Sequence, residues 1–138
     1  MRASWRLYKA DALGGSHHAF TLDWFVYHRH LRVAAFGEAG IGRALEKTDF
    51  LVGGGGVVGV QYHGQWSPYA EMSLLVGAYH QRLFDVSVFS GVMRWTLEAG
   101  VEFYPTPGLF FFAAVGYSHL VLFPGFVPSA ELRLGIGL

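Results

Sequence analysis

The sequence predicts an all-β fold, a closed antiparallel up-and-down transmembrane β-barrel of eight strands that forms one domain over residues 1–138. Three observations predict it. First, short segments alternate apolar residues with charged or tiny ones, and the last segment, 129–138, does so without a break. Second, nineteen glycines disfavour long helices. Third, charged residues make up 14 % of the chain, whereas a soluble domain carries about 25 %.

The composition also limits the functions to consider. The formal net charge is zero, so no basic surface is expected to attract nucleic acid. The chain has no cysteine, which excludes disulfides and thiolate chemistry, and we expect no cofactor. The best apolar run, 109–115, is far shorter than the about 20 residues that a membrane-spanning helix needs. Residues 1–6 lack the apolar core of a signal peptide, so an exported protein is expected to be processed or part of a longer chain.

The expected strands are assigned from side-chain alternation, because successive residues of a strand point to opposite faces. In chain order they cover residues 4–12, 20–27, 31–42, 50–62, 69–79, 94–104, 109–118 and 129–138. The first is the weakest, since Trp5 and Leu7 alternate with Arg6 and Tyr8 before the pattern fades. In the second, Trp24 shares one face with three other apolar side chains.

The third and fourth strands combine alternation with many small residues. The third sends apolar residues to one face and Arg32 and Glu38 to the other. The fourth contains the run 53–56, four glycines, and strand glycines mark a bend or a close backbone approach. We interpret the run as room for bulky inward side chains on neighbouring strands. It is not a phosphate-binding loop, because no Lys-Ser or Lys-Thr pair follows it.

The last four strands are bounded by connections of different lengths. In the sixth strand, Trp95 and Leu97 oppose Arg94, and the seventh is at first apolar on both faces. Residues 81–93 form the longest expected connection, although 84–89 alternates and can extend the neighbouring strands as a hairpin. A short turn is expected at 105–108, where proline and glycine supply turn chemistry. An apolar loop is expected before the eighth strand.

The polar faces carry charged side chains that we expect to point into the barrel. They are Asp23, Arg32, Glu38, Glu71, Arg94, Glu98, Glu102, Glu131 and Arg133. An unpaired charge in such a place costs several kcal/mol in lost hydration. We therefore predict an ion-pair network that fills and plugs a lumen just wide enough for side chains. The alternative is a narrow ion path, or a gate that opens when these charges exchange partners.

The apolar faces decide in which solvent the barrel folds. The residues expected to face lipid are Trp24, Leu74, Trp95, Leu97, Phe103, Phe111, Leu132, Leu134 and Ile136. In a soluble lipocalin-like barrel, the alternative, Leu132, Trp95 and Phe111 would instead surround an apolar ligand. Large aromatic side chains would overfill a small eight-stranded lumen, whereas glycine and a few charges fit it. The membrane orientation is therefore preferred.

These patterns resemble the small eight-stranded outer-membrane β-barrels of Gram-negative bacteria, over residues 20–138. The resemblance implies a place in the bacterial outer membrane, membrane lipid as a partner, outer loops free to contact an unidentified partner, and a structural or interaction role. Aromatic side chains at the strand ends suit two girdles at the membrane interfaces, with ordinary packing as the alternative for several of them. The candidates for these girdles are Trp5, Trp24, Tyr62, Trp66, Tyr69, Trp95, Tyr104 and Tyr117.

Some barrels of this class hydrolyse or acylate lipid A, which makes a lipid A-modifying enzyme the second functional hypothesis. Ser118 with His119, or Ser87 with His80 and Asp85, contain the residue types of a nucleophile, a base and an orienting acid. Neighbouring residues of a strand face opposite ways, which disfavours the first pair, and no His-x-Ser motif is present. We assign no catalytic residue, and expect enzyme activity less than a structural role.

Seven histidines are unusual in a chain with so few charges. His17, His18, His80 and His119 are expected toward the outer end, and His28, His30 and His63 toward the periplasmic end. No cysteine or spaced carboxylate completes a zinc pattern, so we interpret them as polar anchors at the interfaces and assign no metal site.

Overall fold

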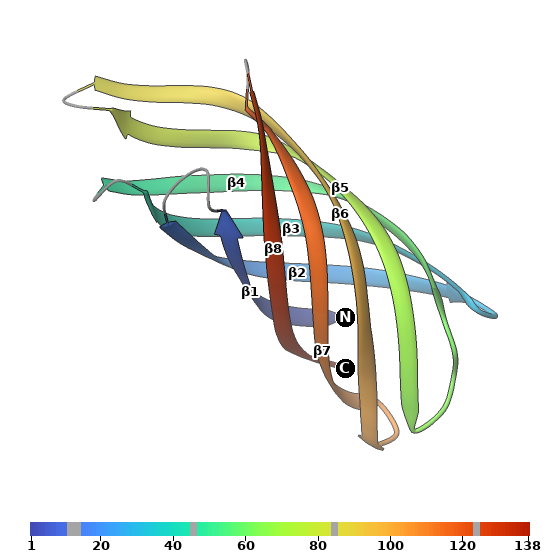
Figure 1. Ribbon diagram of the computed structural model, residues 1–138. Helices are drawn as coiled ribbons and strands as arrows, with labels where there is room; N and C mark the ends of the chain where they lie inside the picture. Colours follow the sequence, from blue (N-terminus) through green and yellow to red (C-terminus); the bar gives the residue numbers. More distant parts are fainter. Residues whose placement is uncertain (11–14, 45–46, 84–85, 123–124) are drawn as a thin grey trace.

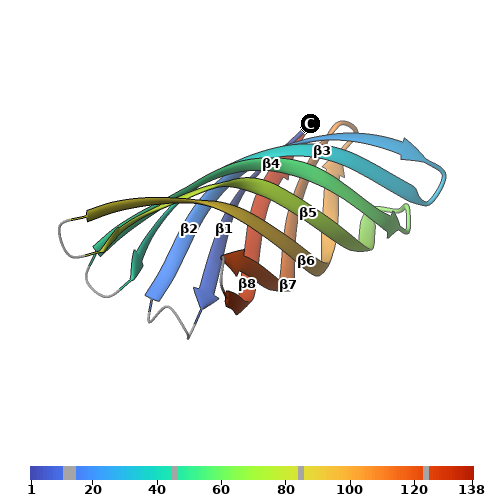
Figure 2. The same cartoon turned by 90° about the horizontal axis from the view of Figure 1, so that it is seen from above.

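The computed structural model describes residues 1–10, 15–44, 47–83, 86–122 and 125–138. Its elements are β1 (Arg2–Ala10), β2 (Gly15–His28), β3 (Leu31–Ala44), β4 (Lys47–Gln61), β5 (Trp66–Leu83), β6 (Val86–Thr106), β7 (Leu109–Leu122) and β8 (Gly125–Gly137). Each strand pairs antiparallel with the next, and β8 pairs with β1, which closes the sheet into a barrel (Figures 1 and 2). The predicted all-β class and the up-and-down order of eight strands are therefore confirmed.

The strands reach further at one end of the barrel than alternation predicted. The expected connection 81–93 is mostly strand, because Gln81 pairs with Val88 in a hairpin that continues β5 and β6; the hairpin interpretation is confirmed. β2 begins at Gly15, within the expected loop, and β8 begins at Gly125, where an apolar loop was expected. Backbone pairing continues at this end although the outward residues are no longer regularly apolar, so the alternation signal stops before the strands do.

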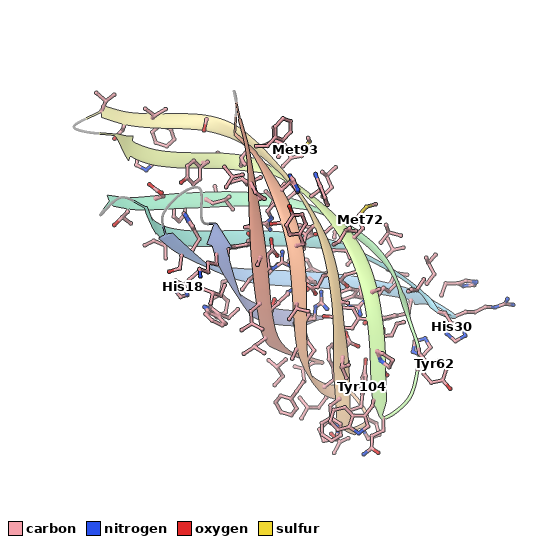
Figure 3. The ribbon with its side chains drawn as sticks, viewed as in Figure 1. His18, His30, Tyr62, Met72, Met93 and Tyr104 are labelled. Atoms are coloured by element: carbon pink, nitrogen blue, oxygen red, sulfur yellow. The ribbon has the colours of Figure 1, made fainter. Side chains whose placement is uncertain are left out.

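Alternation along each strand separates an inner face from an outer face. On β6, Arg94 and Glu98 are buried inside the barrel, whereas Met93 and Leu97 are exposed outside it. The side chains of Met72 and Met93 point away from the ring of strands (Figure 3). Because the side-chain period is two, a single register fixes the environment of a whole strand.

The four-glycine run of β4 lies against β5, and its role differs from our interpretation. A Cβ atom on Gly55 would lie 1.8 Å from the carbonyl oxygen of Leu74, and one on Gly53 would lie 2.8 Å from that of Val76. The inward glycines therefore make room chiefly for the backbone of the neighbouring strand, and only at Gly53 also for an inward side chain, that of Leu75. This close approach accompanies the strong bend of β5 in Figure 1.

The interior has a charged part and an apolar part. Buried apolar residues from β3 to β7, including Phe36, Leu51, Leu75 and Leu120, form one cluster. A second cluster contains Tyr69, Phe110, Phe112 and Ala114. The charged side chains described below occupy the rest of the interior. Among the described residues, no helix is long and apolar enough to cross a membrane.

Candidate functional site

The charged side chains of the lumen come from six of the eight strands. Five arginines and six carboxylates are buried here, each at most 5 % exposed: Arg2, Arg6, Arg32, Arg94, Arg133, Asp23, Glu38, Glu71, Glu98, Glu102 and Glu131. They alternate with outward apolar residues, so the strand period alone brings them to the inner face. Asp49 is a further buried carboxylate and accepts a hydrogen bond of 2.7 Å from the Tyr79 hydroxyl.

One half of the network is centred on Glu38 of β3. Arg94 of β6 donates from Nη1 and Nη2 to the two carboxylate oxygens of Glu38, each at a distance of 2.8 Å. The Tyr8 hydroxyl of β1 donates to Glu38 Oε1. Arg6 lies beside this group, with Nη1 3.3 Å from Glu131 Oε2 and Nη2 3.4 Å from Glu98 Oε2. Such two-pronged arginine–carboxylate pairs are strong and directional.

The other half lies nearer the end of the barrel that carries both chain ends. Arg2 Nε is 2.6 Å from Asp23 Oδ2, and Arg2 Nη2 is 3.0 Å from Glu71 Oε1. Arg133 also pairs with Asp23, and its Nε donates to Ser4 Oγ over 2.8 Å. Asp23 and Glu71 are therefore shared between arginines of different strands.

Glu102 of β6 completes this half of the network. Arg32 lies between two carboxylates, with 3.2 Å to Glu71 Oε2 and 3.2 Å to Glu102 Oε1. The Tyr104 hydroxyl donates to Glu102 Oε2 over 2.7 Å, and Gln61 Nε2 donates to the same oxygen. No cation within the lumen lacks a carboxylate neighbour among the described residues, so the network satisfies the requirement that buried charges be paired.

Each of the five arginines of the lumen lies over at least one aromatic ring. The Arg2 guanidinium carbon lies 4.5 Å from the ring centres of both Phe112 and Phe25. That of Arg32 lies 4.4 Å from the ring centre of Phe25 and 4.2 Å from that of Tyr69. These distances are within the roughly 6 Å at which cation–π attraction acts, and Phe25 contacts both of these arginines.

All nine charged residues that the sequence placed in the lumen are buried there, and the ion pairs above connect them. Arg2 and Arg6 were missed. Both lie on β1, whose alternation in the sequence is short, so the signal that identified the other strands was weak. The two-residue spacing of apolar Ala3, Trp5 and Leu7, which alternate with these arginines, is the pattern that could have found them.

The nine residues expected to face lipid all lie on the outer face. Trp24, Leu74, Leu97, Phe111, Leu132, Leu134 and Ile136 are exposed, and Trp95 and Phe103 are half-buried. The lipocalin-like alternative required Leu132, Trp95 and Phe111 to surround an interior cavity. The structure places them outside, with arginines and carboxylates in the interior, so this alternative is wrong.

The aromatic girdle prediction needs two corrections. Tyr69 is buried and donates a hydrogen bond of 3.0 Å to Glu98 Oε1, and the hydroxyl of Tyr104 binds Glu102. Both point inward because they share the parity of the charged residues on their strands. The other six candidates lie on the outer face, and Trp66 packs on Phe103 with 4.4 Å between ring centres.

The candidate catalytic residues are not assembled. Ser118 is buried in the lumen, where its Oγ lies 2.7 Å from Ser129 Oγ, while His119 stacks outside on Trp95 at 4.7 Å. Ser87 pairs with Arg82 in the β5–β6 register and His80 packs on Phe89, and no hydrogen bond joins Ser87 and His80 in the described part of the chain. Asp85 lies outside the described residues.

No protein-family model matches the chain, and no curated protein matches it in sequence. Solved structures do match. Neisserial surface protein A has a TM-score of 0.70 and 18 % identity, over 98 % of this chain and 91 % of that one. The fold is that of the small eight-stranded outer-membrane β-barrels.

The outer membrane enzyme PagL matches with a TM-score of 0.70 and 16 % identity over the full length of both chains. The N-terminal barrel domain of Pseudomonas aeruginosa OprF matches with a TM-score of 0.64 and 12 % identity, over 99 % and 96 %.

Proposed function

We propose that the protein is an integral barrel of a bacterial outer membrane, with a lumen plugged by ion pairs and a structural or surface-interaction role. The observation that carries this proposal is the separation of charge from the outer surface. Among the described side chains, Lys9 and Arg29 are the only charged residues that are not buried inside the barrel. A barrel that folded in water would need the opposite distribution.

The exposed side chains of the outer face favour a hydrocarbon environment around the barrel. Large apolar side chains are exposed on every strand from β2 to β8, among them Phe20, Val76 and Val115 at more than 60 %. Soluble monomers rarely expose a continuous apolar surface of this kind. Outer-membrane barrels present an outward apolar band about 25 Å tall, which tilted strands of about 9–11 residues cross. Seven of the strands here have 13 residues or more, so they extend beyond such a band.

Three histidine–aromatic pairs favour a membrane interface at the end of the barrel away from the chain ends. His18 stacks on Trp5 at 5.6 Å, His80 packs on Phe89 at 4.5 Å and His119 stacks on Trp95 at 4.7 Å. Rings with one polar edge are favoured at the level of lipid headgroups. We therefore propose that this end faces outward and that these pairs lie at the outer interface.

The β5–β6 hairpin is the surface that we propose for contacts outside the membrane. β6 pairs with β7 only from Val92 onward, so Val86–Gly91 is paired in the described structure with β5 alone. Val86 and Phe89 are 64 % and 74 % exposed. A two-stranded ribbon with exposed apolar residues and an unpaired edge is suited to binding another protein.

The membrane proposal is tested by extraction and electrophoresis. We expect the folded protein to require detergent for dispersion, and to migrate faster on a gel when it is not boiled, because the closed barrel resists unfolding in detergent. A protein that stays dispersed in plain buffer and shows no shift on boiling would contradict the proposal.

The plugged lumen is tested separately in planar bilayers. Because five arginines and six carboxylates fill the interior, we expect no steady conductance from the inserted protein. Large and stable currents would support the ion path instead.

Lipid A modification is the second candidate, and the observation behind it is that PagL, an enzyme of the outer membrane, has a similar barrel. The separation of Ser118 from His119 is unfavourable to it. Expression in a host with a defined lipid A tests it directly: a changed lipid A mass that reverts with His80→Ala would establish an activity, and an unchanged mass is what we expect.

A further inference from the structure

Two connections at the end of the barrel that carries both chain ends bring imidazole rings together. The turn between β2 and β3 carries His30, and the connection between β4 and β5 carries His63. Their ring centres are 5.8 Å apart, with 24° between the ring planes. Tyr62 stacks on His30 at 6.4 Å, and Figure 3 shows these two side chains next to each other at the tip of the barrel. Both histidines are exposed.

A backbone carbonyl fixes one nitrogen of each ring. His30 Nδ1 lies 3.1 Å from the carbonyl oxygen of Gln61, and the Gln61 amide donates back to the carbonyl of His30 over 2.8 Å. His63 Nε2 contacts the carbonyl oxygen of Arg29, a residue held at a φ of 53° in the turn. A carbonyl can only accept, so Nδ1 of His30 and Nε2 of His63 carry the protons. In the neutral rings, Nε2 of His30 and Nδ1 of His63 therefore keep free lone pairs.

This is the arrangement by which proteins prepare histidines for a metal. A metal-binding imidazole almost always donates its other N–H to a carbonyl or carboxylate, which sets its tautomer and its orientation. Two imidazoles that share one ion at 2.0–2.1 Å have ring centres roughly 5 to 6 Å apart. We propose that His30 and His63 form a two-histidine site for a divalent transition-metal ion, with Zn²⁺ and Cu²⁺ as the best-suited ions.

The donor set defines the chemistry of the site. Imidazole favours Zn²⁺, Cu²⁺ and Ni²⁺ over Mg²⁺ and Ca²⁺, which prefer oxygen. No group of three histidine, cysteine or carboxylate side chains gathers around a common point in the described structure. The site therefore has two protein ligands, and water completes the coordination sphere. Its affinity is accordingly modest, and it suits capture and exchange of an ion better than permanent storage.

The other exposed histidines provide matched controls. His28 is the last residue of β2, two residues before His30, and His18 lies at the opposite end of the barrel, stacked on Trp5. Neither is paired with a second imidazole in the described structure. Their replacement lowers the histidine content equally without touching the proposed site.

Calorimetric titration of the folded protein with Zn²⁺, in detergent and without a histidine tag, tests the site. His30→Asn and His63→Gln are the informative variants, because their amide groups can replace the N–H donors to Gln61 and Arg29 while removing the metal-binding nitrogen. We expect each variant to weaken Zn²⁺ binding by at least about tenfold, which is the smallest loss seen even for outer-shell partners of a metal. His28→Asn and His18→Asn should bind as the unaltered protein does.

Electron paramagnetic resonance with Cu²⁺ supplies a second measurement. The unaltered protein should show coupling to two imidazole nitrogens, and each of the two site variants should show one. Absence of Zn²⁺ binding, undiminished binding by His30→Asn and His63→Gln, or an equal loss with His28→Asn would each overturn the assignment. The assay needs only a folded barrel in detergent, so its outcome is independent of the proposed membrane role.

Discussion

Arg94 and Glu38 form a two-pronged ion pair across the lumen, from β6 to β3, with both nitrogen–oxygen distances at 2.8 Å. The pair is almost fully shielded from solvent, and the Tyr8 hydroxyl donates a third hydrogen bond to the same carboxylate. Three strands that are not neighbours therefore meet at one carboxylate. This arrangement makes Glu38 the most informative place to perturb the network.

Replacing Glu38 by Gln should destabilise the barrel by about 3–5 kcal/mol, because it removes the counter-charge that lies closest to the buried Arg94 guanidinium and leaves only Glu131, at 3.9 Å. The double variant Glu38→Gln with Arg94→Met should lose less than the sum of the single changes, since it removes both charges. Urea unfolding of the refolded protein measures both effects. Additive losses would mean that the two side chains do not depend on each other.

Replacing Arg2 by Lys should destabilise the barrel although the charge is unchanged. The planar guanidinium of Arg2 stacks between Phe25 and Phe112 and also contacts Asp23 and Glu71. An ammonium group cannot reproduce this set of contacts. We expect a loss of about 1–3 kcal/mol, as for hydrogen bonds to charged groups.

The control for that variant is the reverse exchange outside the barrel. Lys9→Arg on the exposed face of β1 should change the free energy of unfolding by less than about 0.5 kcal/mol. Equal effects from Arg2→Lys and Lys9→Arg would show that the aromatic stack contributes nothing measurable.

An arginine on the outer face should act according to its depth in the bilayer. Leu97→Arg, near the middle of β6, should cost about 2–4 kcal/mol of folding free energy in lipid vesicles, and Phe89→Arg, on the same face near the start of β6, about 0–1 kcal/mol. Both sites are exposed, Leu97 at 51 % and Phe89 at 74 %, so exposure alone cannot explain a difference. Equal tolerance at the two positions would argue against a bilayer around Leu97.

Replacing either of two neighbouring glycines of β4 by alanine should change the free energy of unfolding by different amounts. At Gly55 the added Cβ meets the Leu74 carbonyl, so the backbone must shift, at a cost of about 1–3 kcal/mol for overpacking. At Gly56 the nearest atom is 3.8 Å away, and we expect a change within about 0.5 kcal/mol. Thermal or urea unfolding distinguishes the two variants, and similar values would contradict the close approach of β4 and β5 at Gly55.

Much of the fold could be predicted because the two-residue period of side-chain direction in a strand determines the face on which each residue lies. Arg94 and Trp95, or Arg133 and Leu134, are sequence neighbours with opposite environments, and a period of two identifies such pairs without any knowledge of the pairing register. The eight strands and their order follow from the same signal. The alternation at 84–89 indicated the β5–β6 hairpin, but the start of β2 could not be found, because residues such as Ser16 continue the strand without continuing the apolar face.

The pairing inside the lumen lies beyond what sequence can provide. Arg2 on β1 meets Glu71 on β5, and Arg94 meets Glu38, because barrel closure and strand tilt bring opposite walls together. No local spacing encodes such contacts. The inward direction of Tyr69 follows from parity, yet a tyrosine is equally common at a membrane interface, so residue type led to the wrong face.

The closure of β1 onto β8 has a kinetic consequence. Arg133 of β8 reaches Ser4 of β1, and Arg2 of β1 reaches Glu71 near the middle of the chain. These contacts join residues distant in sequence, and chains dominated by such contacts fold slowly. An open sheet would separate Arg133 from Asp23 and Arg6 from Glu131, so a half-assembled intermediate is costly. Assembly is therefore expected to be concerted, with the last seam closing at the moment when the arginines find their carboxylates.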